Sequence, residues 1–422
     1  MATVNFESFT DFVRQRVQSF IDNGPWFENR APGFTAFKKA VGFEYIDQKG
    51  FRMPYISGRP GGHTGYLPSN SSFNAAIGPE SQSMYVFPTY YALPMVFQGA
   101  TIRALRNNPD KLVSFDGALQ QYLDAATKRL NQLIYGDGSG ALAFSSSTLS
   151  AGAAQTMNCT TAAAATPGQT KGARRLERRQ SYDAINTSTG AVRGNITVVT
   201  EGTTSCVINV NWGSVSSGDP IVDVGSYNRM IRGLGHLVSN ASRVLQGLNT
   251  ATFIDLNSPV LDLNGTLCTP LDFNKVKTYL QTRQNEETAE NRLMDFCTFG
   301  SYTTLKNQGW NLTIQSTEQT TGGAKKFVDG DTLFIRDADC DEDRHYLVNP
   351  EYVKMFEEMS LGPLSLDGQE LRMLFGNNGT GSDDWQRALA CAANPGIVLP
   401  MSCALIKRAL ISDQVTQVNS YT

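Results

Sequence analysis

One stretch constrains the fold more than any other, because residues 112–143 combine a strong helical pattern with an abrupt stop. Apolar side chains recur there every three or four positions, which places them on one stripe of a helix. Pro109 and Asp110 suit the first turn of such a helix. Gly136 begins the run GDGSG, which a helix does not continue through. The pattern predicts a helix over residues 109–135, about 40 Å long.

Two glycine features of this helix lead to further predictions, the GDGSG run at its end and Gly117 in its middle. A phosphate-binding glycine loop opens a helix, because the anion sits on N-terminal amides. The GDGSG run closes a helix instead, and no Gly-Lys-Ser/Thr follows it, so we interpret it as a turn rather than a nucleotide site. Gly117 costs roughly 1 kcal/mol against Ala inside a helix, and we expect any bend of the helix there.

The totals indicate a folded protein with more than one core. The 422 residues are enough for two or three domains. With 18% charged residues and a net charge of −3, the chain has no global attraction to nucleic acid or to a membrane surface. Charged residues interrupt the first thirty positions, and no apolar run reaches about 18 residues, so neither a signal peptide nor a membrane span is expected.

The residues that usually carry chemistry are sparse. Seven cysteines, an odd count without CxxC spacing, argue against a disulfide framework or zinc site and favour a reducing compartment. Three scattered histidines and the absence of GxSxG offer little for a catalytic triad. The acidic stretch 336–345 (RDADCDEDRH) lacks the Gly and Glu of a calcium loop in either register, starting at Asp337 or Asp339. We interpret it as a solvated loop, and predict no catalytic, cofactor-binding or metal-binding residue.

Two segments near the N-terminus are typical of arms rather than domains. Residues 5–22 place Phe, Val and Ile side chains on one helical face. Acidic and basic residues are mixed on the other face, so docking on protein is favoured over docking on a membrane. Residues 46–95 are rich in Gly, Pro and Tyr, lack apolar periodicity and are too long for an ordinary connection. They predict an extended functional loop whose aromatic residues a partner covers.

The middle of the chain is expected to be β-rich. Residues 145–165 are a low-complexity run of Ser, Ala and Thr. Residues 171–179 (KGARRLERR) form a basic cluster, which we interpret as a solvated turn or a salt-bridge surface between subunits. Phosphate contact is the less favoured alternative, because Glu177 interrupts the cluster. Within 190–240, β-rich runs separated by turn residues predict strands at 195–200, 205–211 and 221–225.

The C-terminal half predicts a second α/β region. Thr269 and Pro270 fit an N-cap followed by Pro at the first helical position, so a helix should begin there. The other expected elements are strands at 293–299, 331–335 and 345–348, a short helix from 302, a helix over 385–393, and a last apolar run over 397–409 broken by Pro400.

This order of segments resembles the major capsid proteins of tailed bacteriophages, with the HK-ninety-seven-type capsid fold. Three stretches carry the resemblance most specifically: 133–143 (LIYGDGSGALA), 217–234 (SGDPIVDVGSYNRMIRGL) and 384–400 (DWQRALACAANPGIVLP). None of them is a catalytic motif. The resemblance implies an α+β fold with an N-terminal arm, an extended E-loop, a peripheral domain with a long spine helix, an axial domain and an elaborated β-rich subdomain.

The resemblance also implies where these parts lie along the chain. The expected order is an N-terminal arm at 1–45, an E-loop at 46–98, the spine helix of the peripheral domain at 99–144, a β-rich peripheral or inserted subdomain at 145–245, an axial domain with a return to the peripheral domain at 246–400, and a C-terminal segment at 401–422.

The function that the resemblance implies is structural and not enzymatic. Copies of the chain would self-assemble in the host cytoplasm into hexamers and pentamers of an icosahedral virion capsid that encloses double-stranded DNA without sequence-specific contact. The other expected partners are a portal, a cement or decoration protein, and a separate scaffolding protein, because the arm begins almost at Met1. No cofactor and no membrane is expected. Two alternatives stay open: the shell of an encapsulin-like nanocompartment, and a cytosolic α/β enzyme.

Some members of this family join an E-loop lysine to an asparagine of a neighbouring subunit. Lys49, at the base of the loop, is the only lysine in residues 46–95. We therefore expect no such covalent cross-link. Boiled, denatured particles should run as a single monomer band on a gel, and a ladder of higher species would contradict the expectation.

Overall fold

The computed structural model describes residues 31–47, 49–56, 81–97, 112–162, 172–284, 293–308, 318–321, 324–329, 332–363, 372–375 and 381–411. In this part of the chain helices and sheets are mixed around three hydrophobic cores. No helix within it is long and apolar enough to cross a membrane. The arm expected at 5–22 lies outside the described residues.

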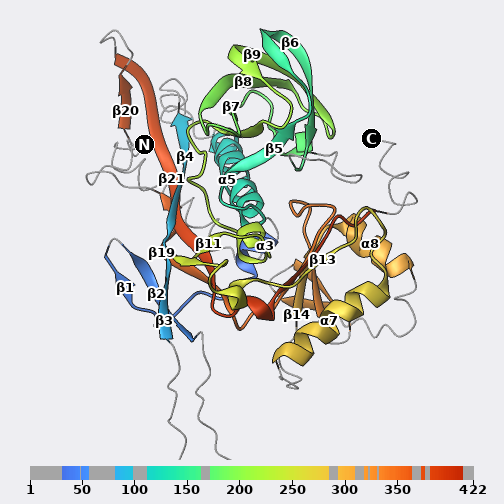
Figure 1. Ribbon diagram of the computed structural model, residues 1–422. Helices are drawn as coiled ribbons and strands as arrows, with labels where there is room; N and C mark the ends of the chain where they lie inside the picture. The colour runs from blue at the N-terminus through green and yellow to red at the C-terminus, as the bar shows by residue number, and fades with distance from the viewer. Residues whose placement is uncertain are drawn as a thin grey trace, which may run out of the picture.

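Helix α5 (Leu112–Ile134) runs through the middle of the molecule (Figure 1). The predicted helix is confirmed over 112–134, while residues 109–111 lie outside the described residues. Side chains of its apolar stripe, among them Leu123 and Leu130, are fully buried in the main core. Its end is also confirmed, since Gly138 follows with a φ of 91°, a conformation that favours glycine. Gly117 is exposed inside an uninterrupted helical segment. The bend expected there stays a prediction.

A long antiparallel sheet lies beside α5 (Figure 1). Its central element is the 17-residue strand β21 (Gly381–Ile397), which pairs with β19 (Val353–Pro363), β20 (Arg372–Phe375) and β4 (Thr89–Phe97). The helix predicted at 385–393 is therefore wrong. Tertiary structure overrides the helical propensity of this Ala-rich segment: β4 and β19 pair with its backbone on both sides, and consecutive side chains from Leu389 to Ala393 are buried.

A small sheet lies at one end of this long sheet (Figure 1). It consists of β1 (Tyr45–Ile46), β2 (Gly50–Ile56) and β3 (Ser81–Val86), with β2 and β3 antiparallel. The segment expected as an E-loop at 46–98 thus contains this hairpin and also β4, which belongs to the long sheet. Residues 57–80 lie outside the described part.

A closed six-stranded barrel follows α5 directly and lies at the upper end of the view in Figure 1. Its strands are β5 (Ala141–Ser145), β6 (Leu149–Thr160), β7 (Ser181–Ile185), β8 (Val192–Thr200), β9 (Ser205–Val215) and β10 (Pro220–Asp223), in the order β10-β5-β6-β9-β8-β7. The three predicted strands of this region are confirmed as β8, β9 and β10. The low-complexity run at 145–165 contributes β6, a strand that was not expected. The barrel has its own core.

A seven-stranded sheet forms most of the C-terminal half. Its order is β13 (Val260–Asp262), β22 (Ala404–Lys407), β18 (His345–Val348), β14 (Leu293–Cys297), β17 (Thr332–Arg336), β16 (Ala324–Asp329) and β15 (Glu318–Thr321). Helices α7 (Pro270–Gln284) and α8 (Phe299–Asn307) flank it in Figure 1. The two faces of β14 pack in different hydrophobic cores. Leu293 packs in the core that includes residues of α7, and Phe296 packs in the core that includes residues of α5.

The helix predicted from Thr269 is confirmed as α7, and the strands predicted at 331–335 and 345–348 are confirmed as β17 and β18. The strand predicted at 293–299 ends at Cys297, and the short helix predicted from 302 begins at Phe299, because Thr298 caps it there. Thr269 caps α7, because its Oγ1 accepts from the Asp272 backbone N–H at 3.2 Å and donates to the Asp272 carboxylate at 2.7 Å. Short elements complete the fold: α3 (Pro32–Thr35), η2 (Gly172–Arg175), α6 (Leu234–Leu237), β11 (Val244–Leu245), β12 (Leu248–Asn249), η3 (Ile254–Leu256) and η5 (Pro400–Ser402).

Candidate functional site

The three stretches that carry the family resemblance meet at the C-terminal end of α5. The Asn228 backbone N–H donates to the Ser139 carbonyl at 2.9 Å, which ties the second stretch to the glycine turn of the first. A Cβ on Gly233 would overlap the Ile134 carbonyl oxygen at the end of the helix. Glycine is therefore the residue that lets the chain at 226–237 cross the helix end this closely.

Asn394 of β21 links the third stretch to this crossing. Its Oδ1 accepts from the Arg232 backbone N–H at 2.9 Å, and its Nδ2 donates to the Phe87 carbonyl at 2.9 Å. One buried amide thus connects the long sheet, the segment after the barrel and the turn between β3 and β4. The three stretches therefore hold parts of the chain together rather than presenting reactive groups.

A second junction is built on the last turns of α5, around Asn131. Its Oδ1 accepts from the backbone N–H groups of Gly33 at 3.0 Å and Phe34 at 3.3 Å. Its Nδ2 donates to the Asp337 carboxylate at 2.7 Å and to the Asp339 carboxylate at 2.9 Å. The side chain is fully buried. A single amide therefore joins α5 to α3 and to the loop after β17.

Two side chains near Asn131, Gln132 in α5 and Tyr135 directly after it, bind the same acidic loop. The Tyr135 hydroxyl donates to the Asp337 carboxylate at 2.7 Å, and Gln132 Nε2 donates to the Asp339 carboxylate at 3.2 Å. Burial raises the pKa of Tyr135 well above its ordinary value, and the charge of Asp337 adds to the effect. Burial, with the nearby Asp339 charge, also raises the pKa of Asp337, although the hydrogen bonds oppose this. The phenol therefore stays a hydrogen-bond donor.

The two charge runs noted in the sequence meet each other at this junction. Arg175 Nη2 donates to Asp341 Oδ1 at 2.7 Å and to the Asp339 carbonyl at 2.9 Å, and Arg174 Nη1 pairs with Glu342 at 3.3 Å. Arg175 and Asp341 are both buried. The interpretation of 336–345 as a solvated loop is wrong, because Asp337, Asp341 and Asp343 are buried. The solvated turn expected at 171–179 is wrong for Arg175, which is buried, whereas Arg178 and Arg179 are exposed. The alternative of a surface between subunits stays a prediction. Arg175 and Asp341 can be buried because each supplies the counter-charge of the other.

The charges in this contact keep the acidic loop ionised at Asp341. Burial alone would raise the pKa of Asp341, but Arg175 and Arg344 outweigh burial and lower it. Arg344 Nη1 lies 3.3 Å from the other Asp341 oxygen. Complementarity between the two runs was the signal in the sequence that could have predicted this contact.

Arg129 extends the junction from α5 into the barrel. Its guanidinium is buried and pairs with Asp223 at the end of β10, with Nε 3.2 Å from Oδ2. It also donates to the Tyr182 hydroxyl at 3.4 Å and to the Arg175 carbonyl at 3.3 Å. The helical pattern placed Arg129 near the helix end, but it did not reveal these partners.

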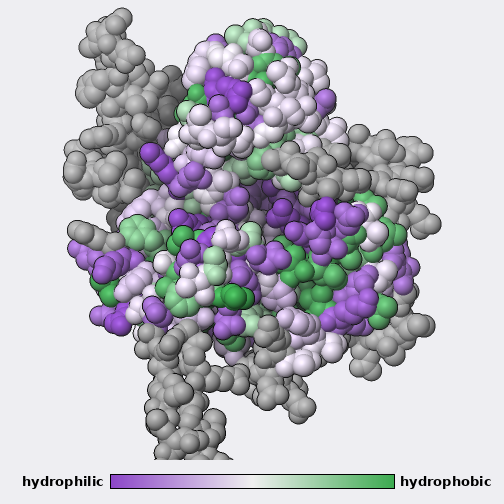
Figure 2. All heavy atoms as spheres, in the orientation of Figure 1, coloured by the Kyte–Doolittle hydropathy of each residue, from purple (hydrophilic) through white to green (hydrophobic). Residues whose placement is uncertain are grey.

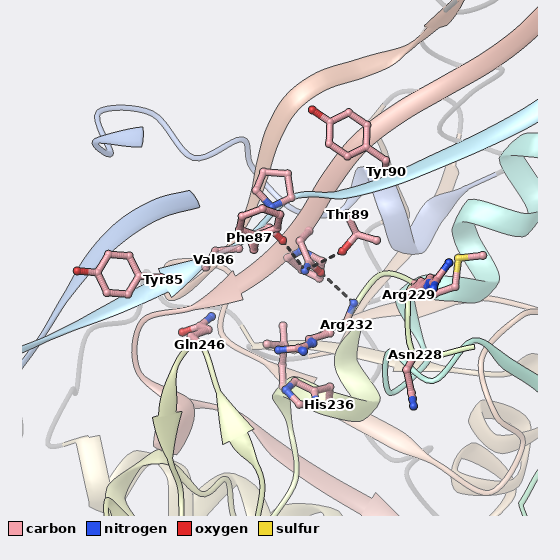
Figure 3. A pocket seen from close by; sticks show the side chains of 15 residues that line it. Tyr85, Val86, Phe87, Thr89, Tyr90, Asn228, Arg229, Arg232, His236 and Gln246 are labelled. Carbon is pink, nitrogen blue, oxygen red and sulfur yellow. Dashed lines mark hydrogen bonds between the residues drawn. The ribbon is translucent and has the colours of Figure 1, made fainter. Parts of the chain in front are cut away.

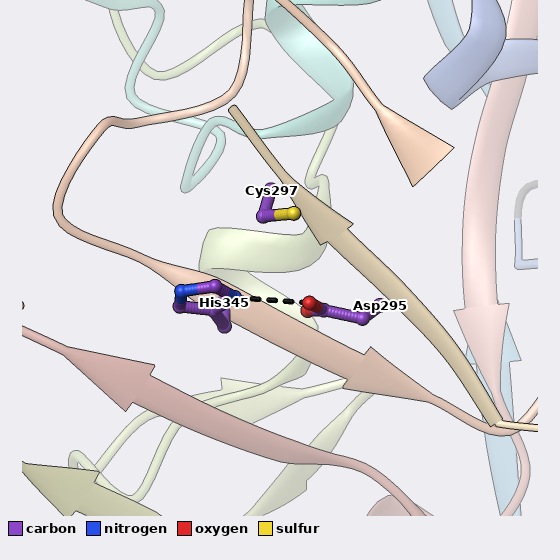
Figure 4. A group of neighbouring side chains, drawn as sticks. All are labelled: Asp295, Cys297 and His345. Carbon is purple, nitrogen blue, oxygen red and sulfur yellow. Dashed lines mark hydrogen bonds and ion pairs between the residues drawn. The ribbon is translucent and has the colours of Figure 1, made fainter. Parts of the chain in front are cut away.

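A third polar group lies in the core between β14 and β18 (Figure 4). Asp295, Cys297 and His345 are buried, and their donor atoms lie within 4.8 Å of one another. These residue types suit zinc, and the sequence analysis did not single them out. His345 Nδ1 lies 2.9 Å from Asp295 Oδ2, so these two side chains pair with each other. Burial, together with the Asp295 charge, raises the pKa of Cys297 well above its ordinary value, which keeps the thiol protonated.

A structural match to a known protein supports the fold independently of the sequence patterns. No protein-family model and no curated protein matches the chain. The chain is similar to a solved structure of the Cyanophage A-1(L) capsid asymmetric unit, with a TM-score of 0.51 at 10% identity over 91% of this chain and 93% of that chain. This confirms the predicted resemblance to bacteriophage capsid proteins at the level of the fold.

Two more distant structural matches were found. A structure of Mycobacterium phage Patience matches with a TM-score of 0.44 at 8% identity, over 96% of this chain and 91% of that chain. The holo-SrpI encapsulin complex of Synechococcus elongatus PCC 7942 matches with a TM-score of 0.42 at 8% identity, over 90% of this chain and 89% of that chain.

Removing one arginine tests the buried charge contact. Arg175→Met leaves the Asp341 carboxylate buried with Arg344 as its remaining partner, and should lower the free energy of unfolding by about 3 kcal/mol. Guanidinium unfolding of the unassembled chain, followed by circular dichroism, measures the change. The matched control is Arg178→Met, an exposed arginine of the same run, which should change stability by no more than about 0.5 kcal/mol. Equal effects of the two variants would contradict the account.

Proposed function

We propose that the chain is the major capsid protein of a tailed bacteriophage with an HK-ninety-seven-type fold. Its copies self-assemble into hexamers and pentamers of an icosahedral shell that encloses double-stranded DNA. The observation that carries the proposal is the match to the cyanophage capsid chain at a TM-score of 0.51. The match extends over nine-tenths of both chains, so it accounts for the whole architecture rather than for one common domain.

The distribution of buried polar contacts supports a structural role. The junctions at α5 fix the barrel, the acidic loop and the N-terminal segment on one helix, as a subunit of a closed shell requires. Their polar groups are buried and engaged with one another, so they do not present a nucleophile and a base to a substrate. This favours a shell protein over the alternative of a cytosolic α/β enzyme.

Exposed apolar residues near the small sheet support contact with other copies. Phe87 is 53% exposed and Tyr90 is 61% exposed, next to the turn between β3 and β4. Val41 and Tyr45, at the start of the same region, are exposed as well. Large exposed apolar side chains that gather in one region mark protein contact surfaces. A neighbouring subunit of the shell would cover them.

The proposal includes the division of the chain into an N-terminal arm (1–45), an E-loop (46–98), a spine helix region (99–144), a β-rich inserted subdomain (145–245), an axial domain with its return (246–400) and a C-terminal segment (401–422). The closed barrel supports the inserted subdomain, and the hairpin of β2 and β3 supports the E-loop. A scaffolding protein, a portal and a cement protein complete the proposed partners, and assembly is placed in the host cytoplasm.

Particle size and content test the proposal. The purified chain should form megadalton particles by light scattering, and particles from infected cells should protect double-stranded DNA from nuclease. A shell that holds an enzyme cargo and no DNA would favour the encapsulin-like nanocompartment instead. A small particle under assembly conditions would contradict both shell functions.

A further inference from the structure

A pocket of about 510 Å³ opens between the turn that joins β3 to β4 and the segment at 228–237 (Figure 3). Arg229, Arg232 and His236 contribute its basic groups, and Tyr85, Phe87 and Gln246 line the opposite side. The described residues that line the pocket include no Asp or Glu. Its charged groups are therefore all basic.

Arg232 is held at this pocket by the junction at the end of α5. Its backbone N–H donates to Asn394 Oδ1. Its side-chain stem crosses the glycine turn so closely that a Cβ on Gly138 would stand 2.7 Å from the Arg232 Cγ. Among the described residues the guanidinium of Arg232 has no acidic partner within 4.0 Å, and neither has that of Arg229. The backbone of Arg232 is fixed while its charge remains unmatched.

His236 lies beside Arg232 in the pocket (Figure 3). Its Nε2 is buried and has no hydrogen-bond partner in the described structure. Burial lowers the pKa of His236 to about 4, and the charges of Arg232 and Arg243 contribute, while a hydrogen bond to the Val244 backbone and the charge of Asp137 oppose them. The Arg243 guanidinium donates to the carbonyls of Leu237 and Ser239 rather than to carboxylates. The positive charges of Arg229 and Arg232 make this pocket suited to a negatively charged oxygen ligand.

We propose that this pocket binds an oxyanion, a carboxylate or phosphate group, with Arg232 as its principal cation. Arg229 adds a second positive charge at the rim. Two sources could provide the anion: a carboxylate side chain of a neighbouring copy, or free phosphate. Residues of one chain form the pocket, so phosphate binding by the unassembled chain tests the site independently of the proposed function. The neighbour's carboxylate as a source rests on the proposed function.

Titration of the unassembled full chain with inorganic phosphate in a calorimeter tests the site itself. The unaltered chain should bind about one phosphate, and Arg232→Gln should weaken the affinity at least tenfold, because it removes a charged hydrogen-bond donor. Arg178→Gln, an exposed arginine on the barrel, should bind as the unaltered chain does. Circular dichroism of Arg232→Gln controls for folding. Absence of binding to the unaltered chain, or equal affinity of Arg232→Gln, would overturn the proposal.

Assembled particles distinguish the two sources. If a neighbour's carboxylate fills the pocket, particles should take up no phosphate, and Arg232→Gln should reduce the yield of particles. If free phosphate is the ligand, particles should bind about one phosphate per chain, and Arg232→Gln particles should lose it. Particles in which Arg232→Gln changes neither uptake nor yield would overturn an anion site in the shell.

Discussion

Burying carboxylates costs free energy unless cations and hydrogen-bond donors accompany them into the interior. In this protein the loop at 337–343 buries three aspartates, and its partners come from two distant places. Asn131 of α5 and Tyr135, directly after this helix, supply neutral donors, and Arg175 of η2 supplies positive charge. The loop therefore reaches its observed position only when helix, barrel entry and C-terminal sheet are assembled together. This polar contact thus links α5, η2 and the loop after β17.

This coupling gives the central helix a particular role. The apolar stripe of α5 packs into the main core in the ordinary way, but three polar side chains near its C-terminal end, Arg129, Asn131 and Gln132, are buried as well. A buried polar contact adds less free energy than an apolar one of equal size. It does require a specific geometry, because each donor needs its acceptor. In a shell subunit that specificity would fix the barrel at one orientation relative to the sheets.

Part of this fold could be predicted from the sequence. The periodicity of residues 112–134 is long and regular enough to identify α5, and Gly136 identifies its end. The strands β8, β9 and β14 follow from runs of β-branched and aromatic residues. β21 was predicted incorrectly because its Ala-rich sequence has helical propensity, and the pairing with β4 and β19 that decides its structure is non-local.

The candidate sites were harder to predict, for a related reason. The charge runs at 171–179 and 336–345 were considered separately, and each alone suits solvent. Only the proximity of the two runs in the fold explains why Arg175 and Asp341 are buried. Helical periodicity shows which face Asn131 and Tyr135 occupy, but it does not reveal partners that lie about two hundred residues away in the sequence. The Asp295 and His345 pair and the basic pocket around Arg232 likewise arise from segments brought together by tertiary structure.

The most direct test of the central claim is a reconstruction of purified particles by electron cryomicroscopy. The account predicts a closed icosahedral shell in which this chain surrounds five-fold axes as pentamers and forms hexamers elsewhere. In each subunit α5 should touch the barrel and the 337–343 loop as described above. A discrete small oligomer without icosahedral symmetry, or a shell in which the barrel is detached from α5, would contradict it.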